Sequence, residues 1–546
     1  MLELIMFALG IYLVYLFIVH VVPVILAVLG AGLMIVAAVA GLIGAIIALK
    51  NYGYAMFKNL NFRKWEWTRG TEPARRSYFF GPGYVQLWRT IKTAFRENLD
   101  SGLAIADKAN DLADYWDGCW GWIVRIACFI YKIVSYIIIF GIGTALCGLF
   151  ALIHGAITTG VMVITYVIFT VVWLIDWIYL MKNKIRSDCP VCKSRFLIPH
   201  FKCPDCGEMH KKLVPGPYGI WTHRCSCGRK LPATFLNGRS NLESYCPNCC
   251  SPLVASDARP TVLQLIGGSN AGKSVYMAAF FHEFLEKLNS NPNLKVTISD
   301  QYRPYFDDLE DWFNGGDCPA TTELNSQMYP VLVDSKLGVR RQFSIYDIAG
   351  EMFDGATADS VIQQQQFQYC DGLLFLLDPF SSGRLREERV SSGGDMSDFS
   401  SMPAEDVTSN FINYLIRTGH AKPNARCDIP IAVMIAKADI REVRRVIGPA
   451  KIHSLMHKDD GQFLNYDEAR DTLCREFLMD IGLASAVNEL EAQFTNLHYY
   501  PISAMGHSPD GSPYEPWGIM EAVEWLLPLA DQEFADLVYP KLISNT

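Results

Sequence analysis

Apolar residues run almost without interruption through two long stretches of the chain, residues 5–49 and 133–181. The first stretch is broken only by His20 and Pro23, and the second is broken at His154–Gly155. A helix that crosses a bilayer needs about 20 apolar residues, so each stretch is long enough for two crossings. This pattern predicts two α-helical transmembrane hairpins, one turning at His20–Pro23 and the other at His154–Gly155.

Positive charge between the two stretches indicates their orientation. No basic segment or small-residue cleavage site precedes the first stretch, so we expect a membrane anchor and not a signal peptide. Because lysine and arginine favour the cytoplasmic side, we expect both hairpins to enter and leave from the cytosol, in a multi-pass protein of the inner (cytoplasmic) membrane. Asp176, between Trp173 and Trp177, is expected at the membrane interface. The basic residues after the first stretch are Lys50, Lys58, Arg63, Lys64, Arg69, Arg75, Arg76, Arg89, Lys92 and Arg96, and those after the second are Lys182, Lys184 and Arg186.

A different pattern fills the C-terminal half, where short apolar runs alternate with polar or glycine-rich turns. The run 372–377 is entirely apolar, which is typical of a strand buried on both faces of a parallel sheet. After the run 261–266, apolar residues recur at helical spacing from Met277 to Leu288. These features predict an α/β domain with a mostly parallel sheet and helices on both faces. Further strands are expected at 329–333, 342–347, 430–435 and 499–502.

Composition agrees with a membrane portion joined to soluble domains. Half of the residues are hydrophobic, and a net charge of −8 with 19% charged residues argues against nucleic acid as a partner. The predicted order is a transmembrane hairpin (1–50), a cytosolic membrane-proximal helical segment (51–120), a second transmembrane hairpin (121–186), a cysteine-rich module (187–256) and the α/β domain (257–546).

The cysteine-rich module carries four closely spaced pairs of thiols. Pairs at this spacing hold Zn²⁺ tetrahedrally, and four pairs are enough for two structural Zn²⁺ ions in a double zinc-ribbon module. A cytosolic location argues against disulfides. No pair offers an open coordination position, so catalytic zinc is not expected. The predicted ligands are Cys189, Cys192, Cys203, Cys206, Cys225, Cys227, Cys246 and Cys249, with Cys250 spare.

The sequence leaves two ways to share the metals, sequential pairing or a nested arrangement. Cys203-Pro-Asp-Cys206-Gly and Cys225-Ser-Cys227-Gly are alike and resemble the two knuckles of one ribbon, which favours nesting. Basic and aromatic residues alternate through this module, but a compact spacer with solvated lysines is the simpler interpretation.

The segment after the run 261–266 fits a phosphate-binding loop, G-x-x-x-x-G-K-S, between a strand and a helix. In such a loop backbone N–H groups close around a polyphosphate. Lys273 would reach the β and γ phosphates and assist catalysis, and Ser274 would bind Mg²⁺. The sequence therefore predicts a bound nucleoside triphosphate. The predicted contact residues are Gly267, Gly268, Ser269, Asn270, Ala271, Gly272, Lys273, Ser274 and Val275.

Three more motifs end predicted strands, where ligands bind in open α/β sheets. The first is Asp347-Ile-Ala-Gly350-Glu351, in which Asp347 is placed to hold Mg²⁺ through water and the Gly350 N–H to sense the γ-phosphate. The others are Ala-Lys-Ala-Asp at 436–439 and Ser-Ala-Met at 503–505.

With these motifs in this order, residues 259–546 resemble the P-loop GTPases, and among them the bacterial membrane-linked double-GTPase-like group of the TRAFAC class. The resemblance implies that Asp439 accepts two hydrogen bonds from guanine and that Lys437 lies along the base. It also implies that Ser503 and Ala504 contact the guanine oxygen. One of Thr321 and Thr322 would coordinate Mg²⁺ beside the γ-phosphate, although a solvent-facing turn around Pro319 fits these threonines equally well.

Two residues depart from the family pattern. Ala436 replaces the usual Asn or Thr, whose side chain ties this loop to the phosphate loop. Glu351 stands where small GTPases often carry a Gln that positions water. We expect Glu351, another residue or an activator's arginine to orient the attacking water, so that turnover is slow without an activator.

The predicted function is a membrane-anchored switch that binds and hydrolyses GTP, and the resemblance suggests bacterial signalling, stress or defence. The alternatives are a membrane ATPase and a nucleotide-locked scaffold that does not hydrolyse. Expected partners are membrane lipid, an unidentified effector or activator protein, and further copies of the chain. Residues 381–406 are rich in serine, glycine and charge, and we expect them to be a mobile insertion beside the nucleotide.

Overall fold

The computed structural model describes residues 1–59, 77–116, 118, 120–315, 327–336, 338–348, 369–393, 399–400, 402–417, 419–422, 425–456, 465–507 and 512–540. The chain forms two compact units. One comprises Met1–Leu174 with Val214–Ala233, and the other comprises Ile175–Leu213 with Thr234–Thr546.

Each apolar stretch forms one continuous helix, so the predicted hairpin turns are wrong. Helix α1 (Leu2–Leu16) passes through a π-helical stretch, η1 (Phe17–Val21), into α2 (Val22–Asn59). Pro23 is accommodated because it falls in the first turn after this widened stretch, where a missing N–H is tolerated. His154 and Gly155 lie inside α4 (Gly121–Lys182), since neither residue prevents a helix.

Both helices are long and apolar enough to cross a membrane by length and composition. The helix Leu2–Asn59 has 58 residues and α4 has 62. At 1.5 Å per residue, 58 residues extend about 87 Å, well beyond a hydrocarbon core of about 30 Å.

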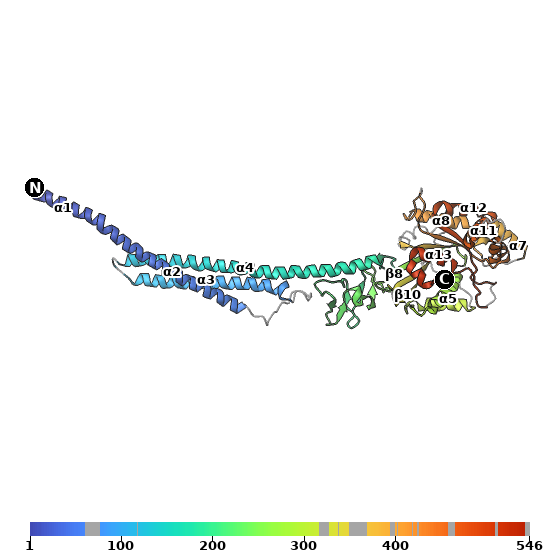
Figure 1. Cartoon of the computed structure of the whole chain (residues 1–546), viewed down its shortest axis with the longest axis horizontal. Coiled ribbons are helices and arrows are strands. Elements are labelled where there is room, and N and C mark those ends of the chain that lie inside the picture. The colour runs from blue at the N-terminus through green and yellow to red at the C-terminus, as the bar shows by residue number, and fades with distance from the viewer. Residues whose placement is uncertain are drawn as a thin grey trace, which may run out of the picture. The chain divides into compact units, whose positions relative to one another are not determined.

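A third helix, α3 (Pro82–Tyr115), follows the short 3₁₀ turn η3 (Tyr78–Phe80) and packs beside α2 and α4 (Figure 1). Polar side chains join these helices: the Asn51 amide donates to Asn98 Oδ1 at 3.1 Å and to Ser101 Oγ at 2.9 Å. The backbone at Gly102 approaches the Tyr136 ring so closely that a Cβ there would lie 2.8 Å from it. Small and polar residues at contacts are typical of closely packed helices.

The cysteine-rich module consists of short strands and turns. Strand β1 pairs with β2, β3 lies between β4 and β7, and β5 pairs with β6, all antiparallel. The elements are β1 (Ser187–Asp188), β2 (Arg195–Phe196), β3 (His200–Lys202), β4 (Met209–His210), β5 (Thr222–Arg224), β6 (Lys230–Pro232), η4 (Phe235–Asn237), η5 (Arg239–Asn241) and β7 (Ser244–Tyr245).

A seven-stranded sheet in the order β14-β13-β12-β8-β11-β10-β9 forms the α/β domain. The strands from β14 to β11 are parallel, as predicted, whereas β10 and β9 add an antiparallel edge. The strands are β8 (Arg259–Gly267), β9 (Leu294–Thr297), β10 (Gln327–Ser335), β11 (Arg341–Asp347), β12 (Gly372–Leu377), β13 (Ile431–Ile435) and β14 (Leu497–Pro501).

Helices cover both faces of this sheet. Along β12, Leu373, Phe375 and Leu377 belong to one hydrophobic core, and Leu374 and Leu376 to the other. The prediction of a strand buried on both faces is therefore confirmed. The helices are α5 (Lys273–Ser290), α6 (Arg303–Phe313), α7 (Gly383–Ser391), α8 (Ala404–Arg417), α9 (Arg441–Ile447), α10 (Pro449–Met456), α11 (Tyr466–Asp480), α12 (Ala484–Gln493), α13 (Glu521–Ala530) and α14 (Gln532–Val538).

The segment 381–406 differs from the mobile insertion that its composition predicts. Its described residues include the helix α7 and the start of α8, and Ser400 is buried. Ser, Gly and charged residues favour loops only statistically, and here buried contacts outweigh that preference.

Candidate functional site

The phosphate-binding loop lies between β8 and α5, as predicted. Asn270 (φ 59°) and Gly272 (φ 98°) adopt left-handed backbone. This conformation is typical of loops whose successive N–H groups form an anion-binding concavity. At Gly267 a Cβ would lie only 2.7 Å from the Leu376 carbonyl oxygen, so only glycine fits there. The Lys273 Nζ donates to the carbonyls of Gly267 at 2.9 Å and Gly268 at 3.0 Å. The loop thus holds this ammonium group over its own backbone.

The two loops predicted to read the base are joined to each other. Ser503 Oγ donates to Asp439 Oδ1 at 2.7 Å and accepts from the Gly506 N–H at 2.9 Å. The Ala438 N–H donates to the Ile502 carbonyl at 3.0 Å. Asp439 is half-buried, and its carboxylate retains lone pairs beyond the one that Ser503 uses.

The base-reading loop 436–439 also contacts the phosphate loop. Lys437, itself left-handed at φ 57°, places Nζ 3.3 Å from the Asn270 carbonyl oxygen and 2.7 Å from Asp378 Oδ2. Sequence reasoning missed Asp378, the residue that follows β12. The sequence does mark its position, because Asp378 directly follows a fully apolar strand. In open α/β sheets, ligands bind at the carboxyl ends of such strands.

The predicted Mg²⁺ residues are only partly described. Asp347 is buried at the end of β11 and pairs in register with Leu265 of β8, next to the phosphate loop. Ser274 lies in the first turn of α5. Oxygen ligands of this kind suit Mg²⁺. The remaining predicted residues of the phosphate-sensing segments, Thr321, Thr322, Gly350 and Glu351, lie outside the described residues.

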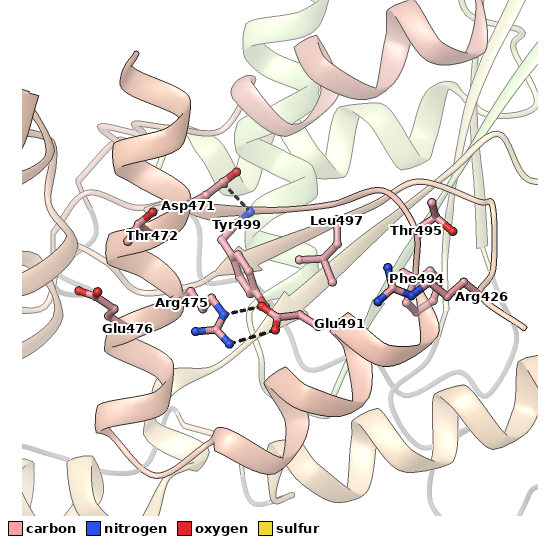
Figure 2. Close-up of a pocket in the computed structure, with 10 residues that line it drawn as sticks. All are labelled: Arg426, Asp471, Thr472, Arg475, Glu476, Glu491, Phe494, Thr495, Leu497 and Tyr499. Carbon is pink, nitrogen blue, oxygen red and sulfur yellow. Dashed lines mark hydrogen bonds and ion pairs between the residues drawn. The ribbon is translucent and has the colours of Figure 1, made fainter. Parts of the chain in front are cut away.

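A separate pocket of about 560 Å³ lies beside β14 and contains none of the predicted nucleotide residues (Figure 2). Inside it Arg475 forms two hydrogen bonds with Glu491, at 2.6 and 3.1 Å, and the Tyr499 hydroxyl donates to the same carboxylate. Within this pocket Arg475 and Glu491 thus neutralise each other.

The fold and the loop define an α/β P-loop nucleotide-binding domain, with the phosphate loop and two further strand-end loops at one edge of the sheet. Residues 264–406 match the model of the Double-GTPase 1 family, so this part of the chain is similar to a GTPase-type domain. No curated protein matches the chain.

Solved structures similar to the chain include sup35 complexed with GMPPNP, at 14% sequence identity and a TM-score of 0.20. They also include sup35 complexed with GDP, at 13% identity and the same TM-score. These matches cover 46% and 45% of this chain, and 38% of each sup35 chain.

In the cysteine-rich module the first and last pairs come together. The sulfur atoms of Cys189, Cys192, Cys246 and Cys249 all lie within 4.8 Å of one another, with Cys189 to Cys249 at 3.4 Å and Cys192 to Cys246 at 3.6 Å. A tetrahedral Zn²⁺ with Zn–S distances of about 2.3 Å requires sulfurs about 3.8 Å apart. The four thiols therefore fit a zinc ion, in the nested arrangement. The inner pairs, at Cys203 and Cys225, belong to different units, and a shared zinc there stays a prediction.

All four cysteine pairs are built alike. The residue after each second cysteine is left-handed and donates its N–H to the carbonyl of the first cysteine, at 2.9 to 3.0 Å. This explains the glycines at two of these positions. It also gives Cys250 a backbone role, while its thiol lies outside the four-sulfur cluster. The left-handed residues are Lys193 (φ 57°), Gly207 (φ 74°), Gly228 (φ 95°) and Cys250 (φ 59°).

Asp176, which the sequence predicts at a membrane interface, is buried in an ion triad, and its position relative to a membrane stays a prediction. Arg239 is fully buried, with Nη1 3.0 Å from Asp176 Oδ2 and Nε 3.1 Å from Asp257 Oδ2. Burial raises the pKa of Asp257, and Arg239 opposes that shift. The triad joins the last turns of α4 to the residues just before β8. Sequence reasoning missed it because Arg239 is 63 positions from Asp176.

We expect Arg239→Met to destabilise the protein strongly, because it leaves two carboxylates buried beside an apolar side chain. Removing one partner of a buried pair costs about 3–5 kcal/mol. The matched control is Arg475→Met, since Arg475 is 42% exposed and surface pairs contribute about 1 kcal/mol or less. Denaturant unfolding of detergent-solubilised protein measures both. Equal losses in the two variants would contradict the assignment of a stabilising triad.

Proposed function

We propose that the chain is a membrane-anchored molecular switch that binds GTP with Mg²⁺ and hydrolyses it. The observation that carries this proposal is the position of Asp439 and Ser503, which are bonded to each other while Lys437 reaches the phosphate loop. A base-reading carboxylate beside a phosphate loop suits guanine, which offers two adjacent N–H donors. Replacing Asp439 by Asn tests the proposal, because that change alters base preference without touching the phosphates.

In this proposal Ser274 and Asp347 hold Mg²⁺, and Lys273 neutralises charge on the β and γ phosphates. Gly350 and one of Thr321 and Thr322 would sense the γ-phosphate. Glu351 or an activator's arginine would orient water. Turnover without an activator is therefore expected to be slow.

We propose the helix Leu2–Asn59 as the anchor in the inner membrane, with the nucleotide domain in the cytosol, where GTP is. Side chains from Leu2 to Val14 are apolar and exposed, except for the charge at Glu3, as a lipid-facing surface would be. A continuous helix that crosses once has its ends on opposite sides. The basic residues after α2 and the nucleotide domain are both proposed to be cytosolic. Both ends of α4 would then lie on the same side of the membrane, so α4 would not cross it as a single span.

The zinc module is proposed to transmit the nucleotide state. Lys193 Nζ lies 4.7 Å from the centroid of the Tyr346 ring, and the Arg195 guanidinium lies 4.2 Å from that of Tyr369. Tyr346 precedes Asp347, and Tyr369 follows the segment that carries Gly350 and Glu351. The residues that follow the Cys189–Cys192 pair therefore contact both ends of the segment that is expected to respond to the γ-phosphate.

Cys189→Ser is expected to lower the bound zinc from two ions per chain to one, because it removes a ligand from a closed four-thiolate site. Cys250→Ser is the matched control and should keep both ions, since Cys250 contributes its backbone and its side chain is exposed. Elemental analysis of the purified protein measures the zinc content. Loss of zinc in Cys250→Ser, or two ions in Cys189→Ser, would contradict the ligand assignment.

A further inference from the structure

Ala436 has no polar side chain with which to tie the base-reading loop to the phosphate loop, and other residues hold this loop. Asp378, only 3% exposed, accepts three hydrogen bonds at this point. Its Oδ1 accepts from the Phe380 N–H at 2.9 Å, and its Oδ2 accepts from the Ser400 N–H at 2.8 Å and from Lys437 Nζ at 2.7 Å. One buried carboxylate therefore joins the end of β12, the segment at Phe399–Ser400 and the base-reading loop.

The Lys437 ammonium is enclosed by three different kinds of group. Besides the Asp378 carboxylate and the Asn270 carbonyl, the Phe399 ring lies beside it, with Nζ 4.4 Å from the ring centroid. Phe399 packs on Phe380, their centroids 4.5 Å apart. A cation held by a carboxylate and an aromatic face has little freedom, so the direction of the lysine stem is fixed.

The same segment also supports the phosphate loop. A Cβ placed on Gly268 would lie 3.1 Å from Ser400 Oγ and 3.3 Å from Val407 Cγ2, so the loop backbone passes directly over these side chains. Arg386 of α7 donates to the Ser400 carbonyl at 2.7 Å and to the Phe380 carbonyl at 3.2 Å, which holds the segment in place.

From these contacts we infer that Asp378 is a positioning residue for guanine-nucleotide binding. It replaces the absent side-chain tie at position 436, and Phe399 completes the enclosure of Lys437. The inference rests on the proposed function, because Lys437 matters only if it lies along a bound base. Asp378 touches the lysine and not the phosphates, so its contribution is the same for the diphosphate and the triphosphate.

The test compares Asp378→Asn with wild type by titration of fluorescent GDP and a non-hydrolysable GTP analogue. Loss of a hydrogen bond between charged groups is expected to weaken both nucleotides by about 10- to 100-fold, through faster dissociation. Asp334→Asn is the matched control, because it removes a partly exposed ion pair with Arg340 and should leave affinity within about twofold. Adding Ala436→Asn to Asp378→Asn should restore part of the affinity, which a merely structural role of Asp378 would not predict.

Wild-type affinity in Asp378→Asn, or loss confined to the triphosphate analogue, would overturn the inference. Failure of wild type to bind either nucleotide would instead overturn the proposed function. If Asp378→Asn does not fold, as judged by thermal unfolding without nucleotide, Phe399→Leu decides. This variant keeps an apolar contact with Phe380 but removes the aromatic face beside Lys437. It is expected to bind about three- to tenfold more weakly, and wild-type affinity in it would then overturn the inference.

Discussion

Lys273→Ala is expected to lower nucleotide affinity by at least about 100-fold, an effect of about 3 kcal/mol. The lysine supplies the positive side chain of the phosphate loop, and the loop carbonyls of Gly267 and Gly268 already hold it in position. Its loss leaves the β and γ phosphates with backbone N–H groups and Mg²⁺ alone. Titration with a fluorescent nucleotide measures the change.

Lys287→Ala is the matched control for that experiment, because Lys287 lies on the same helix, α5, and pairs with Glu524 at the surface. Its nucleotide affinity should equal that of wild type. If Lys273→Ala bound nucleotide as tightly as Lys287→Ala, the loop 267–274 would not be the phosphate site.

Features encoded by neighbouring residues could be predicted from the sequence. The phosphate loop depends on glycines and a lysine within eight consecutive positions, and the strand 372–377 on six consecutive apolar residues, so both have local signals. The structure places both as expected, in the loop after β8 and in β12. The cysteine pairs are local too, although which pairs share a metal is not.

Features that depend on distant partners could not be predicted. The Asp176–Arg239–Asp257 triad joins residues far apart in the chain, and no pattern in the sequence marks it. The place of Asp378 after an apolar strand is visible in the sequence, but its hydrogen bonds to Ser400 and Lys437 are not. The antiparallel direction of β10 could also not be predicted, because an apolar run has the same pattern in parallel and antiparallel strands. The prediction of two hairpins was wrong for a related reason, because hydropathy gives the length of an apolar stretch but does not show whether the chain turns within it.

Asp439→Asn is expected to reverse base preference from guanine to xanthine. A carboxylate accepts both N–H donors of guanine, whereas an amide offers one acceptor and one donor, which matches xanthine. The Asn Oδ1 can still accept the hydrogen bond from Ser503 Oγ, so the loop should keep its shape. Leaving a buried polar group unpaired gives strong discrimination, and we expect a loss of GTP affinity of at least about 100-fold.

The most direct test of the central claim is therefore a competition measurement with GTP, ATP and XTP on detergent-solubilised wild-type and Asp439→Asn protein. The account predicts that wild type prefers GTP over ATP, and that the variant prefers XTP and hydrolyses it slowly. Equal binding of ATP and GTP, unchanged by Asp439→Asn, would contradict the account and favour a membrane ATPase. Selective GTP binding without any turnover in membranes would instead leave a nucleotide-locked scaffold.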